Sequence, residues 1–344
     1  MVESILKEIE LRKDYLQHKT IETIYFGGGT PSLLSANEIE EILNKTQEFY
    51  QIAPGAEITL EANPEDLTQS YLKDLFSVGI NRLSIGIQSF TEKNLPFLNR
   101  NHSLEQSKNS IYWAQNQGFK KLSLDYIFGI PGTNLKDVEQ ELQTVLSTEA
   151  THLSTYSLTI EPKTFFGRRA KKGLFTETPE KNMAEQFTFV MDYLQANGFQ
   201  QYEISNFAKN GDISVHNSSY WKQEEYAGFG PSAHSFDGKS RQWNVSSNGK
   251  YLQLIQKGEP FFEYESLNPT DILNELIMTR LRTAWGLSLD EFQEKTKTLQ
   301  LPFPEKIITD WIKEDFAFVS NQHLILTKKG KLIADKLSSD LFYI

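Results

Sequence analysis

Segments of strand-type and helix-type sequence alternate five times between residues 21 and 196, and no other feature of the chain restricts its fold so strongly. The strand-type segments are Ile21–Phe26, Glu57–Glu61, Arg82–Gln88, Lys121–Phe128 and His152–Ile160. Each precedes a stretch with helical spacing of apolar residues, namely Asn37–Phe49, Gln69–Phe76, Leu104–Gln117, Leu135–Leu146 and Glu180–Ala196. Strands joined by helices of this length form parallel sheets through right-handed crossovers, so we predict an α/β fold with a closed or partly closed barrel.

Polar or glycine residues follow nearly every predicted strand. A glycine triplet follows the first strand, where only glycine adopts a positive φ without cost and leaves the backbone open to another molecule. Ligands of such barrels bind at the carboxyl ends of the strands, although each polar residue alone could equally be a hydrogen-bonded structural group. Together they predict one ligand site, with the candidate residues Gly28, Gly29, Thr30, Glu61, Gln88, Arg100 and Asp125.

These side chains suit a ligand that carries an amine, a carboxylate and a sugar. Bare backbone beside Glu61 suits an ammonium group, and the Arg100 guanidinium can bind a carboxylate with two parallel hydrogen bonds. Asp125 and Gln88 can accept and donate hydrogen bonds to ribose hydroxyls. A phosphate is a poorer ligand, because Glu61 and Asp125 would repel it.

Composition excludes several classes of function. The net charge of −10 argues against a nucleic-acid groove, which needs a basic face. No apolar run is long enough to span a membrane and no signal peptide is present, which predicts a cytoplasmic protein. The chain contains no cysteine, so it offers no thiolate to a metal ion or an iron–sulfur cluster.

Five motifs together resemble a known family. TIYFGGGTPS, LEANPE, GIQSF, LNRNHS and DYIFGIPG stand in the order found in radical S-adenosylmethionine (SAM) enzymes of the branch similar to anaerobic coproporphyrinogen-III oxidase. The segment His216–Trp221 resembles the HNxxYW signature of the haem chaperone group within that branch. The resemblance implies a partial radical SAM-type (β/α) barrel that lacks its first strand and carries an α+β, winged-helix-like C-terminal domain.

The resemblance also implies cofactors and roles. Gly28, Gly29 and Thr30 would face the methionine part of SAM, and Glu61 would accept from its ammonium group. Gln88, Arg100 and Asp125 would hold the ribose and the carboxylate. His216 would bind haem iron as an axial ligand; the alternative is a loop histidine that donates to a carbonyl. His234 is a weaker second candidate.

The motif that defines the family is absent. Its CxxxCxxC loop holds a [4Fe–4S] cluster, and this chain has none of the three cysteines. Two explanations stay open: the start methionine lies inside a longer gene whose upstream part encodes the cysteines, or the protein is a variant that lost the cluster. We favour the first, because a barrel without its first strand exposes backbone at two edges.

The leading functional hypothesis is a haem chaperone that binds haem and SAM and delivers haem to client proteins. Whether the client proteins lie at a membrane surface, and whether the protein is a homodimer, stays open. The first alternative is oxygen-independent coproporphyrinogen-III oxidase, which decarboxylates a propionate by radical chemistry. A second is a non-radical barrel enzyme acting on a ribose-containing metabolite. Neither nucleic-acid binding nor a membrane span is predicted.

The chain is expected to divide into three parts. Residues 1–200 form the truncated barrel, 201–268 an extension with HNxxYW and a glycine-rich loop over the barrel mouth, and 269–344 a winged-helix-like domain. Acidic residues on the last part favour packing or client docking over DNA binding. The basic run Arg168–Lys172 is expected to be a solvated loop, or alternatively to contact porphyrin propionates or an acidic partner.

Overall fold

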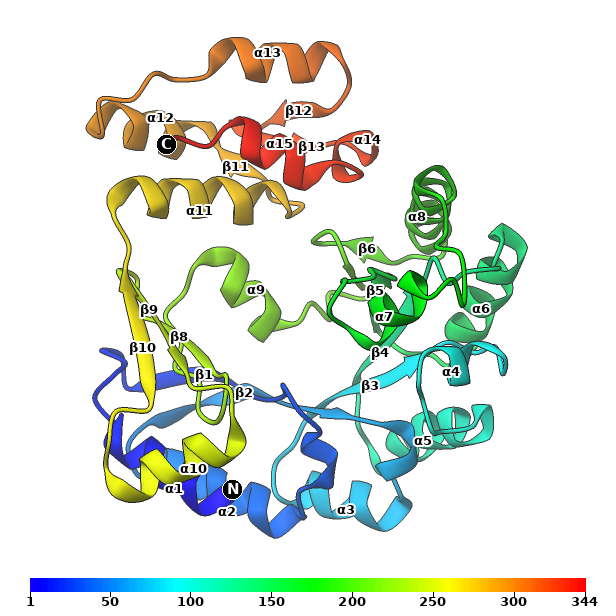
Figure 1. Cartoon of the computed structure of the whole chain (residues 1–344), viewed down its shortest axis with the longest axis vertical. Coiled ribbons are helices and arrows are strands. Elements are labelled where there is room, and N and C mark those ends of the chain that lie inside the picture. The colour runs from blue at the N-terminus through cyan, green and yellow to red at the C-terminus, as the bar shows by residue number, and fades with distance from the viewer. The chain divides into compact units, whose positions relative to one another are not determined.

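The structure is a computed structural model that describes residues 1–344, apart from the side chain of Phe165. The chain forms two compact units. The first comprises Met1–Gly29, Leu33–Ile58 and Ser214–Ile344, and the second comprises Thr30–Ser32 and Thr59–Ile213. Both units are therefore built from segments that are far apart in the sequence, as the colours in Figure 1 show.

A seven-stranded sheet has the order β1-β2-β3-β4-β5-β7-β6. Its strands are β1 (Thr20–Phe26), β2 (Gln51–Ala62), β3 (Arg82–Gln88), β4 (Lys121–Phe128), β5 (His152–Ser157), β6 (Gln200–Gln201) and β7 (Asn206–Ala208). Strands β2 to β5 pair in parallel, whereas β7 is antiparallel to both β5 and β6. The predicted α/β class and parallel sheet are confirmed, and the predicted strand 152–160 ends earlier, at Ser157.

The two faces of strands β2 to β5 differ in chemistry. Glu61 pairs with Ser84, Ser84 with Ser123, and Asp125 with Ser154, so these polar residues share one face. The opposite face is apolar and fully buried, as the residues Leu60, Leu83, Ile85, Leu122, Leu124 and Leu153 show. In a filled barrel both faces would be apolar, and the polar face therefore indicates an opening for a polar ligand.

Helices cover the apolar face of this sheet in the second unit (Figure 1). They are α3 (Gln69–Ser77), α5 (Leu104–Gln117), α6 (Leu135–Ser147) and α8 (Glu180–Ala196). The shorter helices of this unit are η1 (Pro31–Leu33), η2 (Pro64–Asp66), α4 (Asn94–Phe97) and α7 (Phe165–Lys171). The basic run Arg168–Lys172 lies on α7 up to Lys171, so the expectation of a solvated loop was wrong for this stretch. Asn134 caps α6 and Ser103 caps α5, each in a capping box that satisfies two backbone donors.

In the first unit, α1 spans Val2–Leu11 and α2 spans Ala36–Gln47. A capping box begins α2, because Ser35 and Glu38 cap each other's backbone. The remaining elements of the middle segment are α9 (Val215–Lys222), β8 (His234–Phe236), β9 (Ser240–Asn244), α10 (Asn248–Lys257) and β10 (Phe262–Ser266). His216 therefore lies on a helix, so the alternative of a loop histidine was wrong.

The C-terminal segment has the predicted winged-helix-like form of helices and a β-hairpin. Its elements are α11 (Pro269–Leu281), β11 (Leu287–Ser288), α12 (Leu289–Thr298), α13 (Glu305–Lys313), β12 (Ala317–Ser320), β13 (His323–Leu326), α14 (Lys328–Lys331) and α15 (Ala334–Asp340). Its strands form an antiparallel sheet in the order β11-β13-β12. Among the described residues, none of the helices is both long and apolar enough to cross a membrane.

Candidate functional site

Asp125 lies at the centre of the polar face of the second unit. Ser84 Oγ donates to its Oδ1 at 3.1 Å, and Ser154 is its partner on β5. Burial raises the pKa of Asp125 to about 6; the nearby charge of Glu61 also raises it, whereas hydrogen bonds from Ser154 and Ser84 oppose the shift. The part of the polar face around Asp125, here called the recess, therefore has two carboxyl groups that interact electrostatically, an arrangement that favours a cationic ligand.

Glu61 is the penultimate residue of β2, and the turn that follows it is held by hydrogen bonds to Ser32. The Ser32 hydroxyl donates to Asp66 Oδ2 at 2.6 Å and accepts from the Asn63 backbone N–H at 3.3 Å. Thr30, a predicted site residue, is exposed and lies two residues before this buried serine in the same unit. The turn therefore joins the segment after the glycine triplet to the segment after Glu61.

Gln88 ends β3 in an unusual conformation. Its φ is +66°, in the left-handed region that residues with a Cβ rarely adopt, and the β3–β4 register shifts between Ile85 and Gln88. Gly86 makes room for it, because a Cβ on Gly86 would lie 2.9 Å from Gln88 Nε2. Strained conformations of this kind are often found at ligand sites, where the surrounding structure holds them.

Arg100 is held near the recess by residues that sequence reasoning did not single out. Its Nη1 donates to Asn63 Oδ1 at 3.4 Å, and its charge lowers the pKa of Asp125. Two residues further on, the buried His102 places Nε2 3.3 Å from the Ile87 carbonyl oxygen and Nδ1 3.3 Å from Glu65 Oε2. His102 therefore connects three chain segments of the recess. No spacing in the sequence indicates a contact with a backbone carbonyl.

The glycines of the predicted site belong to the first unit. Gly28 has a φ of +76°, which explains why glycine stands there. A Cβ on Gly29 would meet no atom within 4 Å, so packing within the protein does not require glycine at this position. The structure thus places Glu61, Gln88, Arg100 and Asp125 together in the second unit, and it places Gly28, Gly29 and His216 in the first.

His216 sits in the first turn of α9 with defined partners. Its Nδ1 lies 2.8 Å from Thr23 Oγ1, and its Nε2 lies 3.1 Å from the hydroxyl of Tyr220 one helical turn later. The ring stacks on Tyr25, with centroids 4.6 Å apart and planes 10° apart. Residues of strand β1 therefore fix the plane of the imidazole, and the exposed side chain of Tyr220 contacts its Nε2.

The imidazole of His216 is neutral at physiological pH. Burial lowers its pKa to about 4, although the negative charge of Glu57 acts in the opposite direction. A neutral ring nitrogen is the form that binds a metal ion. His234, the second candidate, is exposed on β8 and has Trp243 as a ring neighbour.

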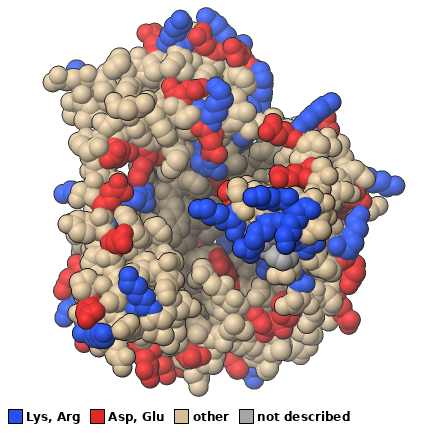
Figure 2. Space-filling model, in the orientation of Figure 1, with Lys and Arg blue, Asp and Glu red and all other residues tan. Residues whose placement is uncertain are grey.

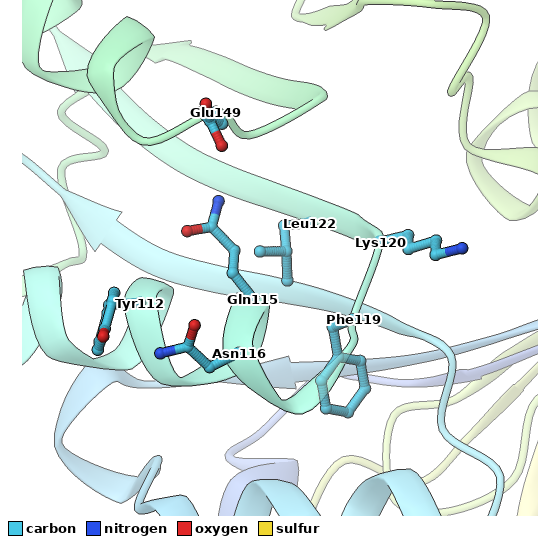
Figure 3. A pocket seen from close by; sticks show the side chains of 7 residues that line it. All are labelled: Tyr112, Gln115, Asn116, Phe119, Lys120, Leu122 and Glu149. Carbon is cyan, nitrogen blue, oxygen red and sulfur yellow. The ribbon is translucent and has the colours of Figure 1, made fainter.

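A surface pocket elsewhere on the second unit does not coincide with these residues. It has a volume of about 460 Å³ and lies between the end of α5 and the start of β4, with Gln115, Lys120 and Glu149 in its wall (Figure 3). This is the amino-terminal end of the strand, whereas ligands of parallel sheets bind outside the carboxyl ends. The pocket is therefore not assigned to the predicted site.

The described residues fit two of the three cofactors implied above. The recess offers acceptors for an ammonium group and for ribose hydroxyls, and His216 offers a neutral nitrogen for haem iron. The cluster does not fit, because the chain has no cysteine and no group of three or more His, Asp or Glu among the described residues could hold a metal ion.

Comparisons with known proteins agree with the fold and with the motifs. Residues 2–145 match the family model of the radical SAM superfamily, and residues 267–333 match that of the HemN C-terminal domain. The solved structure of coproporphyrinogen III oxidase (HemN) from Escherichia coli superposes with a TM-score of 0.82 at 20% identity, over 98% of this chain and 81% of that one. This likeness shows the fold. Residues 2–145 thus match the radical SAM class.

Curated relatives narrow the class to one family. The heme chaperone HemW of Bacillus subtilis is 37% identical over 92% of this chain and 84% of its own length. That of Lactococcus lactis is 31% identical over 96% of this chain and 86% of its own length. The chain belongs to the HemW heme chaperone family.

Proposed function

We propose that this chain binds haem with His216 as an axial ligand and delivers it to client proteins. The observation that carries the proposal is the neutral imidazole of His216, oriented by Thr23 and stacked on Tyr25. Iron would replace the Tyr220 hydroxyl at Nε2, because Nδ1 is occupied on the strand side. We also propose that residues 269–344 dock client proteins.

Replacement of His216 by Ala tests the ligand assignment. We expect haem affinity to fall about tenfold or more in a Soret titration, with an unchanged circular dichroism spectrum, because one axial ligand is lost and the fold is kept. His234→Ala is the matched control and should bind haem like the wild type. An unchanged titration for His216→Ala would refute the assignment.

We propose that the recess around Asp125 binds SAM, with Glu61 accepting from its ammonium group. The two neighbouring carboxyl groups and the strained Gln88 support this assignment. The wild-type protein used in the haem titrations should not decarboxylate coproporphyrinogen. Measurable decarboxylation would favour the oxidase alternative.

Replacement of Glu61 by Ala should abolish SAM binding in equilibrium dialysis, because the ligand's ammonium would be left without an acceptor in a partly desolvated recess. Glu92→Ala, which removes an exposed carboxylate from the loop after β3, is the control and should leave the affinity unchanged. Equal affinities of wild type and Glu61→Ala would contradict the assignment.

A further inference from the structure

An acidic side chain is buried on the helix side of the sheet in the second unit. Figure 2 shows Asp and Glu side chains over the face that it draws, whereas Glu141 of α6 is only 5% exposed and is followed by the fully buried Leu142. Its Oε1 accepts hydrogen bonds from the Ser89 hydroxyl and, at 3.3 Å, from Asn94 Nδ2. Burying a carboxylate costs free energy even where donors surround it. An aliphatic residue would avoid this cost, so packing alone does not explain Glu141.

Ser89 is the residue that Glu141 holds. Ser89 is fully buried, and besides donating to Glu141 its hydroxyl accepts from Asn94 Nδ2 at 3.0 Å and from the Thr91 backbone N–H at 3.1 Å. These three contacts use the donor and both acceptor sites of the hydroxyl. Ser89 follows the last residue of β3, so these contacts fix the chain where the strand's own pairing ends.

The backbone of Ser89 closes a tight turn around Gln88. The Ser89 N–H donates to the Ile87 carbonyl at 2.8 Å, and Gln88, the residue between them, has a φ of +66°. A bond from residue i+2 to residue i around a positive φ is the pattern of a γ-turn of the rare, strained kind. The Ile87 carbonyl also lies 3.3 Å from His102 Nε2. Such a turn persists only where the surrounding structure holds it, and Ser89 is one of its two ends.

The turn brings the Gln88 amide to the polar face of the sheet. Gly86 lies two residues after Ser84 and therefore on the polar side of β3. A Cβ on Gly86 would lie 2.9 Å from Gln88 Nε2 and 4.0 Å from Asn63 Oδ1, so the amide lies in the recess. Glu141 makes its contact on the other side of the sheet, with the next residue of the chain. A single peptide bond therefore separates the residue that Glu141 holds from the residue that faces the recess.

We propose that Glu141 is a positioning residue for the recess: by holding Ser89 it keeps the turn closed, and the closed turn directs the Gln88 amide toward the ribose hydroxyls of SAM. The proposal rests on the binding of SAM in the recess proposed above, and all of its residues belong to the second unit. Glu141 does not touch the ligand. Its replacement should therefore change SAM affinity only through Gln88.

Equilibrium dialysis of SAM against the whole chain tests the proposal. Glu141→Ala should lower the affinity about tenfold, because the strained turn can relax once Ser89 is released. Glu141→Gln keeps an acceptor for both donors, so it should lower the affinity by no more than about threefold. Gln88→Ala should lower the affinity about tenfold as well. The double variant of Glu141→Ala and Gln88→Ala should lose no more than Gln88→Ala does, since both changes act through the same amide.

Two further variants separate positioning from stability. Leu142→Ala, the matched control, removes a fully buried side chain from the same helix, so it should destabilise the protein in urea denaturation and leave SAM affinity unchanged. Ser89→Ala removes the other partner of the contact and should lower SAM affinity as Glu141→Ala does. It decides the case if Glu141→Ala does not fold.

The outcomes distinguish this proposal from the assignment of SAM to the recess. Wild-type affinity in Glu141→Ala would overturn this proposal alone. Losses that multiply in the double variant would also overturn it, because Glu141 would then act independently of Gln88. An equal loss of affinity in Leu142→Ala would overturn it too, since any damage to α6 would have the same effect. A wild type that binds no SAM would overturn both proposals.

Discussion

Ligand binding and burial have opposite effects on the ionisation of Asp125. A cationic ligand binds best to an ionised carboxylate, but burial and the neighbouring Glu61 both disfavour the charged form. The folded protein therefore binds a proton at Asp125 more tightly than the unfolded chain does. Between the ordinary pKa of 3.8 and the folded pKa of about 6, this contribution to stability is lost as the pH rises.

Replacement of Asp125 by Asn should consequently stabilise the protein and weaken SAM binding. At pH 7.5 we expect the free energy of unfolding to rise by roughly 1–2 kcal/mol, because the ionised group is removed from a partly buried recess while Ser84 keeps an acceptor. The difference should vanish near pH 4, where the wild-type carboxyl is protonated. Urea denaturation at the two pH values measures it, and a less stable variant at pH 7.5 would contradict the pKa direction.

His216 should show a different pH response. Because burial lowers its pKa to about 4, the imidazole stays neutral well below the pH at which an ordinary histidine becomes protonated. We expect haem affinity, measured by Soret titration, to stay constant between pH 7.5 and 5.5. A marked weakening over that interval, absent in controls with free haem, would show that the ring titrates normally.

At the scale of elements, α9 depends on a carboxylate from outside the helix. Glu57 of β2, which is 2% exposed, accepts from the His216 backbone N–H at 3.0 Å, from the Val215 N–H at 3.2 Å and from the Ser214 hydroxyl at 3.1 Å. A negative charge at a helix N-terminus satisfies free backbone donors and interacts favourably with the helix dipole. The position of His216 is thus coupled to a strand more than 150 residues earlier in the chain.

Replacement of Glu57 by Ala should release the start of α9. We expect a loss of about 2–4 kcal/mol in the free energy of unfolding, since buried donors are left without an acceptor, together with weaker haem binding. Glu57→Gln keeps an acceptor, so it should lower both the free energy of unfolding and the haem affinity less than Glu57→Ala does. Urea denaturation and Soret titration test this. Equal values for the Ala variant and the wild type would show that Glu57 does not position His216.

At the scale of the molecule, a buried ionic network in the first unit joins α1 to residues more than 200 positions later. Glu8 is fully buried and binds Arg12 at 3.1 Å, the Asn244 amide at 2.7 Å and the Tyr251 hydroxyl at 2.6 Å. Arg12 in turn donates to the Gly228 carbonyl at 2.9 Å. The network fixes the glycine-rich segment 226–237 on the N-terminal helix.

Replacement of Glu8 by Ala should destabilise the protein by about 3–5 kcal/mol, because Arg12 would stay buried without its counter-charge. The matched control is Glu10→Ala on the same helix, whose carboxylate is exposed and should contribute less than about 0.5 kcal/mol. Thermal or urea unfolding of the two variants measures the difference. Similar losses for both would contradict a structural role for the network.

The sequence alone determined the parallel sheet, the α2 capping box and the winged-helix-like segment, because these depend on local periodicity and on residues three or four positions apart. It also singled out Glu61, Gln88, Arg100 and Asp125 as candidate site residues, although Asp125 lies within β4 and not at its end. Only the tertiary structure decided the rest: the helix that carries His216, the contact of His102 with the Ile87 carbonyl, and the low pKa of the His216 ring. Burial and long-range contacts set these properties, and no spacing along the chain encodes which distant residue will supply the partner.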